Sequence, residues 1–230
     1  MTITDASDLD DLDHPLSALQ RSLKRTFDLL AAAGGLLVLS PVIILVCIGA
    51  TIDTRQNGFF THERVGQFGE RFKVIKFRSM RDDLAEDVDT HVTAHDDPRI
   101  TRFGRFLRDT NLDELPQLFN IVKGEMSFVG PRPEVPGFAD ELTGEDRKIL
   151  MVRPGMTGPS TLNFLDEEEL LLQTDDPESF NREVLYPTKV KINRRYVEDY
   201  SLVNDLRYIL YSIRGKPMDI IDVTSYTDKY

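Results

Sequence analysis

The longest run of apolar positions in the chain extends from Leu29 to Ile52 and contains no charged residue. A run of about 20 apolar residues is long enough for a helix to cross the hydrocarbon core of a bilayer. Ser40-Pro41 lies within this run, and a proline inside a helix removes a backbone donor and clashes with the carbonyl four residues earlier, here that of Leu37. The pattern therefore predicts a membrane helix interrupted at Ser40-Pro41, where the Ser40 hydroxyl can satisfy a freed backbone group.

The charges that flank this run bear on how the helix enters the membrane. Basic residues favour the cytoplasmic side of a membrane, and they stand at both ends of the run: Arg21, Lys24 and Arg25 before it, Arg55 and Arg64 after it. A re-entrant helix over residues 21–55, broken at Ser40-Pro41 and leaving by the leaflet through which it entered, satisfies both observations. A spanning helix with a proline kink is the alternative that the sequence leaves open.

Shorter patterns along the rest of the chain predict a mixed fold. Residues 72–77 are typical of a β-strand. Residues 99–108 predict an amphipathic helix at the membrane interface, with packing on the protein's own core as the alternative. Further helices are expected over 116–122, 166–173 and 189–214, and turns over 130–137, 153–159 and around Pro177. We therefore expect an α/β fold that is rich in helices, with short strands and no long parallel sheet.

The domain organisation follows from length and composition. Residues 1–20 are acidic and polar, which predicts a disordered leader and not a secretory signal. The re-entrant helix occupies residues 21–55, and residues 56–230 form one domain, because 230 residues leave little room for two. The single cysteine, Cys47, has no partner for a disulfide, which fits a reducing compartment.

The charge and the histidines exclude several classes of function. The net charge of -11 argues against nucleic acid as a general partner, since surfaces that bind nucleic acid are usually basic. Basic residues nevertheless gather in two stretches, 64–81 and 99–108, where we expect anionic ligands. The four histidines are scattered, and we interpret the pair His91 and His95 as surface residues because no acidic residue completes a zinc motif. The sequence also lacks a Walker A motif, a dinucleotide fingerprint and a nucleophile elbow.

Asp113 and Glu114 are adjacent acidic residues followed by Pro116. Neighbouring side chains on a regular helix diverge by about 100°, so these carboxylates can meet one ligand only near a helix end or a turn. A proline is tolerated in the first turn of a helix, so a helix should begin at or just before Asp113, where its positive end favours the ionised carboxylate. The structural alternative is that Asp113 caps the helix, alone or in a capping box with Thr110.

An ionised carboxylate can attack phosphorus and form an aspartyl phosphate, provided that the charge of the target is neutralised. The candidate cations for this role are Lys76, Arg78, Arg108 and Arg132. Arg132 stands between two prolines, which fix the backbone and aim a planar donor group suited to phosphate. Oxygen ligands suit Mg²⁺ that bridges a diphosphate, so we expect Mg²⁺ as the cofactor and Asp113 and Glu114 as its ligands.

Six motifs in order resemble one family, the bacterial sugar transferases or monotopic phosphoglycosyl transferases. The resemblance covers most of residues 24–214, which makes chance a poor explanation. Its motifs are Lys24-Arg25-Thr26-Phe27-Asp28, the Ser40-Pro41 interruption, the segment from Phe72 to Met80, the segment from Thr110 to Asn120, the segment from Met126 to Pro133, and Arg153-Pro154-Gly155-Met156-Thr157-Gly158.

The resemblance implies an enzyme that moves a sugar-1-phosphate from a UDP-sugar to a polyprenol phosphate and releases UMP. By this resemblance Asp113 is the nucleophile that carries a covalent phosphosugar, and Glu114 is the metal-associated member of the dyad. Lys76 and Arg108 resemble residues that position the phosphate or the dyad, and Arg132 resembles a nucleotide or phosphate contact. The family also implies a re-entrant helix and an active site on the cytoplasmic face of the inner membrane.

One segment departs from the family pattern. Residues 159–164 replace a sequence that many relatives carry after Thr157-Gly158, and this leaves the identity of the sugar open. The polyprenol, the pathway and the formation of a homodimer are also left open. Two alternatives remain: an adaptor that binds membrane lipids without catalysis, and a glycosyltransferase that releases UDP.

Overall fold

The computed structural model describes residues 13–81, 97–218 and 220–221, without the side chains of residues 168 and 169. The chain divides into two compact units, each built from segments that are distant in the sequence. Unit 1 contains Met1–Asp28, Arg64–Phe72 and Gly124–Tyr230, and unit 2 contains Leu29–Glu63 and Lys73–Lys123. The sequence predicted a single domain after residue 55, because no linker of unusual composition marks where the chain passes between the units.

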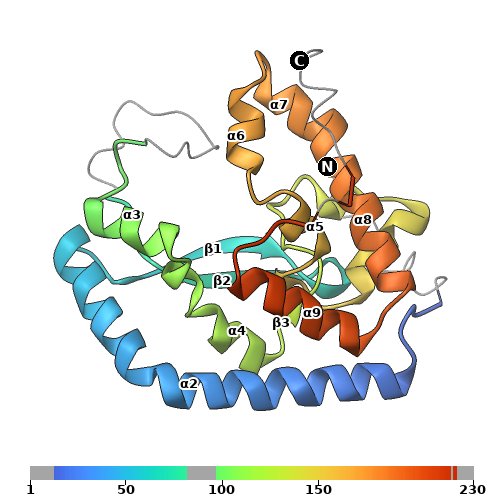
Figure 1. The fold of residues 1–230 in the computed structure, drawn as a ribbon, viewed down its shortest axis with the longest axis horizontal. Helices are drawn as coiled ribbons and strands as arrows, with labels where there is room; N and C mark the ends of the chain where they lie inside the picture. Colours follow the sequence, from blue (N-terminus) through green and yellow to red (C-terminus); the bar gives the residue numbers. More distant parts are fainter. Residues whose placement is uncertain (1–12, 82–96, 219, 222–230) are drawn as a thin grey trace. The chain divides into compact units, whose positions relative to one another are not determined.

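The elements confirm a helix-rich fold with short strands (Figure 1). The long helix α2 is followed by two paired strands, three short helical segments, two further strands and five helices, with 3-10 turns between them. Their bounds are α2 (Ala18–Thr54), β1 (Phe59–Val65), β2 (Arg71–Phe77), α3 (Arg102–Asp109), η3 (Leu112–Glu114), α4 (Gln117–Lys123), β3 (Ser127–Val129), η5 (Gly144–Met151), β4 (Gly155–Thr157), α5 (Pro159–Asn163), α6 (Glu167–Leu172), α7 (Pro177–Phe180), α8 (Tyr186–Glu198) and α9 (Leu202–Ile213).

Helix α2 is continuous through Pro41, so the prediction that the helix is interrupted at Ser40-Pro41 is wrong. The helix instead bends part-way along its length (Figure 1). The Ser40 hydroxyl donates to the carbonyl oxygen of Leu37 at 2.9 Å, which satisfies the acceptor that Pro41 leaves without its usual donor. One lost backbone bond is thereby compensated locally, and the helix continues.

The start of α2 also differs from the expected leader over residues 1–20. Residues 1–12 lie outside the described part of the chain, but α2 begins at Ala18 and Leu16 is buried in the core of unit 1. The hydroxyl of Ser17 accepts from the backbone of Gln20, and the side chain of Gln20 accepts from the backbone of Ser17, as in a capping box. Ordered structure therefore begins before residue 21.

An apolar core of unit 2 surrounds the second half of α2. Ile43, Phe77 and Leu107 are its buried members, and they bring α2, β2 and α3 together. The opposite face of α2 leaves large apolar side chains in contact with solvent, among them Leu37, Leu45 and Ile52, which are 79%, 69% and 72% exposed. By length and composition α2 is able to cross a membrane.

Helix α3 begins later than residue 99, where the sequence placed it. Thr101 is its N-cap, because its hydroxyl accepts from the backbone of Gly104 at 2.8 Å. Asp97 instead binds the guanidinium of Arg99, with an Nη2 to Oδ2 distance of 2.6 Å. This ion pair keeps Arg99 in the turn before the helix.

Unit 1 contains a short parallel pair of strands, of which β3 lies just before the turn predicted over 130–137 and β4 lies within the turn predicted over 153–159. Strands β3 and β4 pair with Ser127 opposite Gly155 and Val129 opposite Thr157. A Cβ atom on Gly155 would lie 2.2 Å from the backbone nitrogen of Gly130, so the chains approach as closely as glycine allows. The pairing fixes the backbone at the point where the chain leaves β3 towards Arg132.

The C-terminal part of unit 1 has more helices than the sequence predicted. The stretch over residues 189–214 forms α8 and α9 with an interruption at 199–201, and the loop expected around Pro177 is the short helix α7. The carboxylate of Asp176 caps α7 by accepting from the backbone of Ser179 at 3.1 Å. The acidic helix predicted over residues 166–173 is confirmed as α6.

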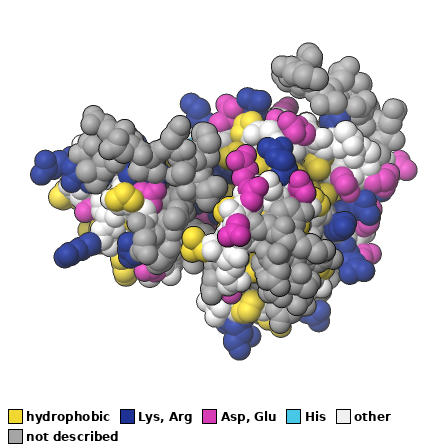
Figure 2. Space-filling model, turned by 90° about the horizontal axis from the view of Figure 1, so that it is seen from above, with side chains coloured by type: hydrophobic (Ala, Val, Ile, Leu, Met, Phe, Trp, Pro, Cys, Tyr) yellow, Lys and Arg dark blue, Asp and Glu magenta, His cyan; other side chains and the backbone are white. Residues whose placement is uncertain are grey.

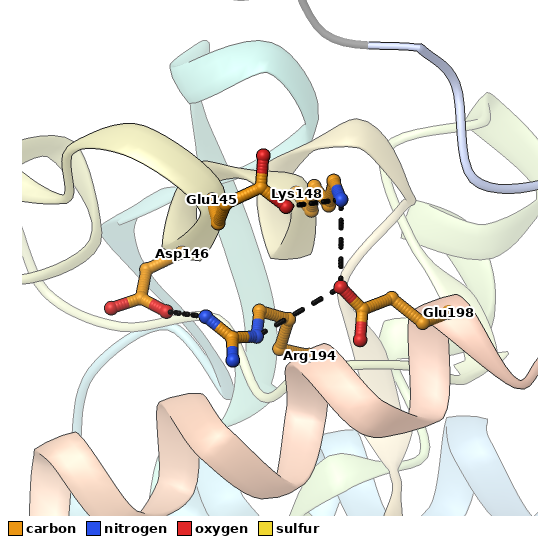
Figure 3. Close-up of polar contacts among 5 residues, drawn as sticks. All are labelled: Glu145, Asp146, Lys148, Arg194 and Glu198. Atoms are coloured by element: carbon orange, nitrogen blue, oxygen red, sulfur yellow. Dashed lines mark hydrogen bonds and ion pairs between the residues drawn. The ribbon is translucent and has the colours of Figure 1, made fainter.

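A network of charged side chains joins η5 to α8 (Figure 3). Arg194 binds Asp146 with an Nη1 to Oδ1 distance of 2.9 Å, and its Nε lies 3.9 Å from Glu198. Lys148 pairs with both Glu145 and Glu198. A single exposed ion pair contributes little stability, but a connected set limits the relative motion of the two elements.

Figure 2 shows a face of the molecule on which acidic and basic side chains stand next to one another. Hydrophobic side chains gather there only in small groups. Such a mixture is typical of a surface exposed to water, where scattered apolar atoms are normal.

Candidate active site

The acidic pair lies in a 3-10 turn of unit 2, as required for two neighbouring carboxylates to approach one ligand. The turn η3 covers Leu112–Glu114, and it begins after Asn111, which has a left-handed φ of 54°. Asp113 lies inside the turn, and Asn111 occupies the cap position of η3 without a side-chain hydrogen bond to the turn. Asp113 is nevertheless only 7% exposed.

Lys76 connects the two carboxylates. Its ammonium nitrogen lies 2.8 Å from Oε1 of Glu114 and 3.6 Å from Oδ2 of Asp113. Lys76 is carried by β2, and the acidic pair by η3, so two elements of unit 2 form this cluster. A cation between two adjacent acids offsets their mutual repulsion, so that both carboxylates can lie next to one ligand.

Asn120 fixes the strand that carries Lys76 to the helix that follows the acidic pair. Its amide donates to the backbone oxygen of Lys73 at 2.8 Å and accepts from the backbone nitrogen of Ile75 at 3.0 Å. The side chain of Asn120 is fully buried. Asn120 thus bonds one backbone donor and one backbone acceptor of β2. Because β2 carries Lys76, these bonds also fix the distance between Lys76 and η3.

Replacing Asn120 by leucine is expected to reduce both stability and turnover. The substitution leaves the Ile75 donor and the Lys73 acceptor without their partner, at a cost of about 1–3 kcal/mol for each group that becomes desolvated. Lys76 would lose its fixed position, so kcat should fall more than KM rises. Thermal unfolding and initial rates on the full chain measure the two effects. Asn204→Leu on α9, where the amide accepts from the exposed Arg207, is the control; equal effects in both variants would contradict the assignment.

The structure places the other predicted cations differently. The Arg108 guanidinium lies 3.9 Å from the sulfur of Met80, and among the described residues it makes no ion pair within 4 Å. The Arg78 Nε donates to the backbone oxygen of Asn57 at 3.0 Å, and its guanidinium lies over the ring of Phe60. Arg78 therefore has a structural role at the end of the β1–β2 pair, in addition to any contact with a ligand.

Arg132 belongs to unit 1 and is exposed just beyond the end of β3. The backbone oxygen of the preceding Pro131 accepts from Gly155 at 2.9 Å, which anchors the loop as the flanking prolines suggested. Arg132 lines a pocket of unit 1 together with residues of η5 and α8. Because Asp113 and Arg132 lie in different units, a shared role remains a prediction from the sequence.

The donor atoms near Lys76 fit Mg²⁺ better than a transition metal. Among the described residues no group of three or more His, Cys, Asp or Glu side chains could enclose a metal ion. Two adjacent carboxylates offer only oxygen ligands, and Mg²⁺ commonly takes one or two of these and completes its shell with water and phosphate oxygens. The interpretation of His91 and His95 lies outside the described residues.

Sequence reasoning identified the acids and Lys76 but missed Asn120 as a positioning residue. Its signal is a polar residue on the apolar side of the short helix that follows Pro116, where neighbouring Leu118 and Ile121 are buried. A buried amide in that position must find hydrogen-bond partners, so the pattern alone could have predicted a link to another element. It could not have predicted that the link is to β2.

Comparison with known proteins agrees with the motifs. The family model for bacterial sugar transferase matches residues 19–216. The chain is 38% identical to the UDP-galactose-lipid carrier transferase of Erwinia amylovora over 84% of its own length and 40% of that protein. It is 37% identical to the exopolysaccharide production protein PSS of Rhizobium leguminosarum bv. phaseoli, with 84% and 97% covered. It is 38% identical to the undecaprenyl-phosphate galactose phosphotransferase of Salmonella typhimurium, with 81% and 38% covered.

These matches confirm the family predicted from the motifs: the chain belongs to the bacterial sugar transferases. It corresponds to less than half the length of two of these relatives and to nearly all of the third. The matched region includes α2 except its first residue, the acidic pair and Arg132.

Proposed function

We propose that this protein transfers a sugar-1-phosphate from a UDP-sugar to a polyprenol phosphate and releases UMP. The observation that carries the proposal is the pair of adjacent carboxylates, buried Asp113 and half-buried Glu114, bridged by Lys76 within a sugar transferase. The names of two relatives support it, since one acts on UDP-galactose and a lipid carrier and the other on undecaprenyl phosphate and galactose.

In the first step an Oδ atom of Asp113 attacks the phosphorus that bears the sugar. The new bond joins that oxygen to phosphorus, and the bond from the same phosphorus to the oxygen of UMP breaks. UMP leaves with the electron pair, and a phosphosugar remains on Asp113 as an acyl phosphate. A buried carboxylate next to a lysine suits this step, because it has lost part of its competing hydration and lies beside a cation that can offset the charge of the phosphate.

In the second step an oxygen of the polyprenol phosphate attacks the same phosphorus. The bond to Asp113 breaks, the carboxylate is regenerated, and a polyprenol diphosphate sugar leaves. One phosphoanhydride has been exchanged for another through an acyl phosphate, so the reaction needs no further energy source.

Charge neutralisation is assigned to Mg²⁺ and to the cations of the chain. Glu114 and Asp113 would hold the ion, which would offset the negative charge of the diphosphate. Lys76 keeps the two acids at a fixed distance, and Arg108, Arg78 and Arg132 are the further candidates for phosphate contact. Phosphoryl transfer depends mainly on such positioning and charge stabilisation.

We further propose that α2 inserts into one leaflet as a re-entrant helix on the cytoplasmic side of the inner membrane. A single spanning helix usually exposes most of its surface to lipid, whereas the second half of α2 packs one face on the core of unit 2. The other face is exposed and apolar, and basic residues flank both ends of the helix. Exposed Leu206 and Leu210 on α9 and Phe106 on α3 are candidate contacts at the interface.

The proposal is tested by incubating the full chain in detergent or nanodiscs with a panel of UDP-sugars, Mg²⁺ and polyprenol phosphate. We expect UMP release from at least one sugar donor together with a lipid-linked diphosphate sugar. Chelation of divalent ions should stop the release, and added Mg²⁺ should restore it. Release of UDP would instead indicate transfer of the sugar without its phosphate, and activity that survives chelation would contradict the metal assignment.

A further inference from the structure

Gln117 is the first residue of α4 and follows the acidic pair closely in unit 2. It is only 3% exposed, although glutamine is mostly found at protein surfaces. Within the part of the chain that the structure describes, its side-chain amide makes no hydrogen bond. Buried amides normally have partners in the protein or in ordered water, so this amide is available to a partner outside the chain.

Gln117 lies on the same side of its helical segment as the acidic pair. The helical turns continue from η3 into α4, since a bond to the carbonyl three residues earlier is made by the backbone nitrogens of Leu115, Leu118 and Phe119. Gln117 comes three residues after Glu114 and four after Asp113, and side chains at these spacings are neighbours on a helix. Helical side chains also lean towards the N-terminus, which places the amide of Gln117 over the turn η3.

The other buried amide of α4 differs from Gln117 in its contacts. Asn120 bonds β2 with both ends of its amide, at 2.8 and 3.0 Å. Gln117 makes neither kind of bond, and neither of its amide atoms is among the completely enclosed polar atoms of the described residues. A ligand can therefore reach the amide of Gln117. Asn120 serves the fold, whereas the fold gives Gln117 no comparable role.

The acidic pair also leaves room for a donor of hydrogen bonds that carries no charge. The ammonium of Lys76 is engaged by both acids, at 2.8 Å from Glu114 and 3.6 Å from Asp113. The side chains of Asp113 and Glu114 keep 10% and 14% exposure, so a ligand can approach them. Gln117 is carried by the same unit and could contact such a ligand without disturbing the pairing of Lys76.

We infer that the amide of Gln117 belongs to the active site and donates to an oxygen of the phosphate that Asp113 attacks, an inference that rests on the proposed function. Phosphate oxygens only accept hydrogen bonds, and the amide nitrogen offers two N–H donors. The phosphorus must come within bonding distance of Asp113. Its other oxygens then lie beside a side chain that is one helical turn away.

The position of the amide suits stabilisation of the transition state. In phosphoryl transfer, negative charge is spread over the oxygens of the transferred group. A donor that is already held in place stabilises this charge without reorganisation. Leaving the amide unpaired in the free protein lowers stability, and the hydrogen bond to substrate recovers that energy. Such an exchange of stability for activity is common in active sites.

A hydroxyl of the sugar is the alternative partner. It would use both the oxygen and the nitrogen of the amide, whereas a phosphate uses only the nitrogen. Phosphate is favoured because the attack fixes its place next to Asp113 for every donor, while the sugar can extend away from η3. Water is the remaining alternative, and it gives the amide no part in the reaction.

The test uses Gln117→Met, which removes the amide and nearly keeps the length and volume of the side chain. We expect kcat for UMP release to fall about ten- to a hundredfold, the effect of one hydrogen bond to a charged group. The variant should unfold at the same or a higher temperature than the wild type, because no bond within the protein is lost. Asn120→Leu, by contrast, should lower the unfolding temperature.

Binding provides a readout that does not depend on turnover. Calorimetry with inorganic pyrophosphate and Mg²⁺, on the full chain in nanodiscs, should show about three- to tenfold weaker binding for Gln117→Met. Gln117→Glu should lose more affinity and more activity, since a carboxylate repels phosphate. Gln173→Met alters an exposed glutamine at the end of α6 and is the control, with wild-type values expected in each assay.

Several results would overturn the inference. Wild-type transfer by Gln117→Met would mean that the amide pairs with water. A clear drop in its unfolding temperature would assign the amide to the fold. Unchanged affinity for pyrophosphate with weakened binding of a UDP-sugar would assign it to the sugar.

The same measurements separate this inference from the proposed function. If the wild type releases UMP and Gln117→Met matches its rate and its affinity for pyrophosphate, the role of Gln117 is wrong and the transfer reaction stands. If no UDP-sugar yields UMP but pyrophosphate binds the variant more weakly, Gln117 contacts phosphate and the proposed reaction is wrong.

Discussion

Asp113→Asn is expected to reduce UMP release by about three orders of magnitude or more, the scale seen when a covalent nucleophile is removed. The amide has nearly the shape of the carboxylate but no negative charge, so it cannot attack phosphorus. Lys76 keeps its contact with Glu114, at 2.8 Å, so the turn η3 has no reason to unfold. Initial rates with a UDP-sugar and polyprenol phosphate measure the loss.

The control for this variant is Asp109→Asn, which neutralises an exposed carboxylate at the end of α3 in the same unit. Its rate should equal that of the wild type. A donor labelled in the sugar, added without lipid acceptor, should leave label on Asp113 of the wild type and none on Asp113→Asn. Full activity of Asp113→Asn, or label at another residue, would refute the covalent step. An adaptor without catalysis would show no transfer in the wild type and unchanged membrane binding in the variant.

The parts of the fold that were predictable from the sequence are those with a local cause. The charge-free run predicted a long apolar helix, and Ser40 was expected to satisfy a backbone group freed by Pro41, because proline geometry acts within one turn. Strand β2 followed from alternating β-branched and aromatic residues, and α4 from the proline before it. Asp113 and Glu114 were identified for the same reason, since Pro116 and the turn act on their immediate neighbours.

The parts that were not predictable depend on contacts between distant segments. The pairing of β3 with β4 joins residues that the sequence marks only as rich in glycine and proline. The link from Asn120 to β2 and the division into two units likewise arise from contacts across more than 40 positions. Polar groups such as Asn193 have no local signature, because whether an amide is paired depends on what the fold brings near it.

A buried ion pair fixes the first turns of α2 to α9 within unit 1. The ammonium of Lys24 lies 2.6 Å from Oδ2 of Asp205, and the two residues are 7% and 1% exposed. The other oxygen of Asp205 accepts from the hydroxyl of Tyr196 at 2.8 Å. Burial raises the pKa of Asp205, and the positive charge of Lys24 acts against that rise. Lys24 therefore offsets part of the cost of burying this carboxylate.

Lys24→Met should destabilise unit 1 by about 3–5 kcal/mol, because it leaves the Asp205 carboxylate buried without its counter-ion. The melting temperature of the full chain should fall by roughly 6–20 °C on the scale expected for a protein of this size. Lys24→Met with Asp205→Leu should recover much of the loss, since an apolar pair of similar volume avoids the uncompensated charge. If the single and double variants unfold at the same temperature, the pair does not act through its charges.

The pH dependence supplies an independent readout of the same pair. In Lys24→Met the pKa of folded Asp205 should rise further above its unfolded value of about 4, so the folded state binds the extra proton. The free energy of unfolding of Lys24→Met is then closest to that of the wild type below a pH of about 4. It falls behind the wild type as the pH rises towards the pKa of Asp205 in the folded variant. Unfolding measured across this range should show the deficit growing with pH. A deficit that is constant with pH would mean that Lys24 contributes through a contact other than its pairing with Asp205, such as that of its ammonium over the ring of Tyr200, 5.6 Å from the centroid.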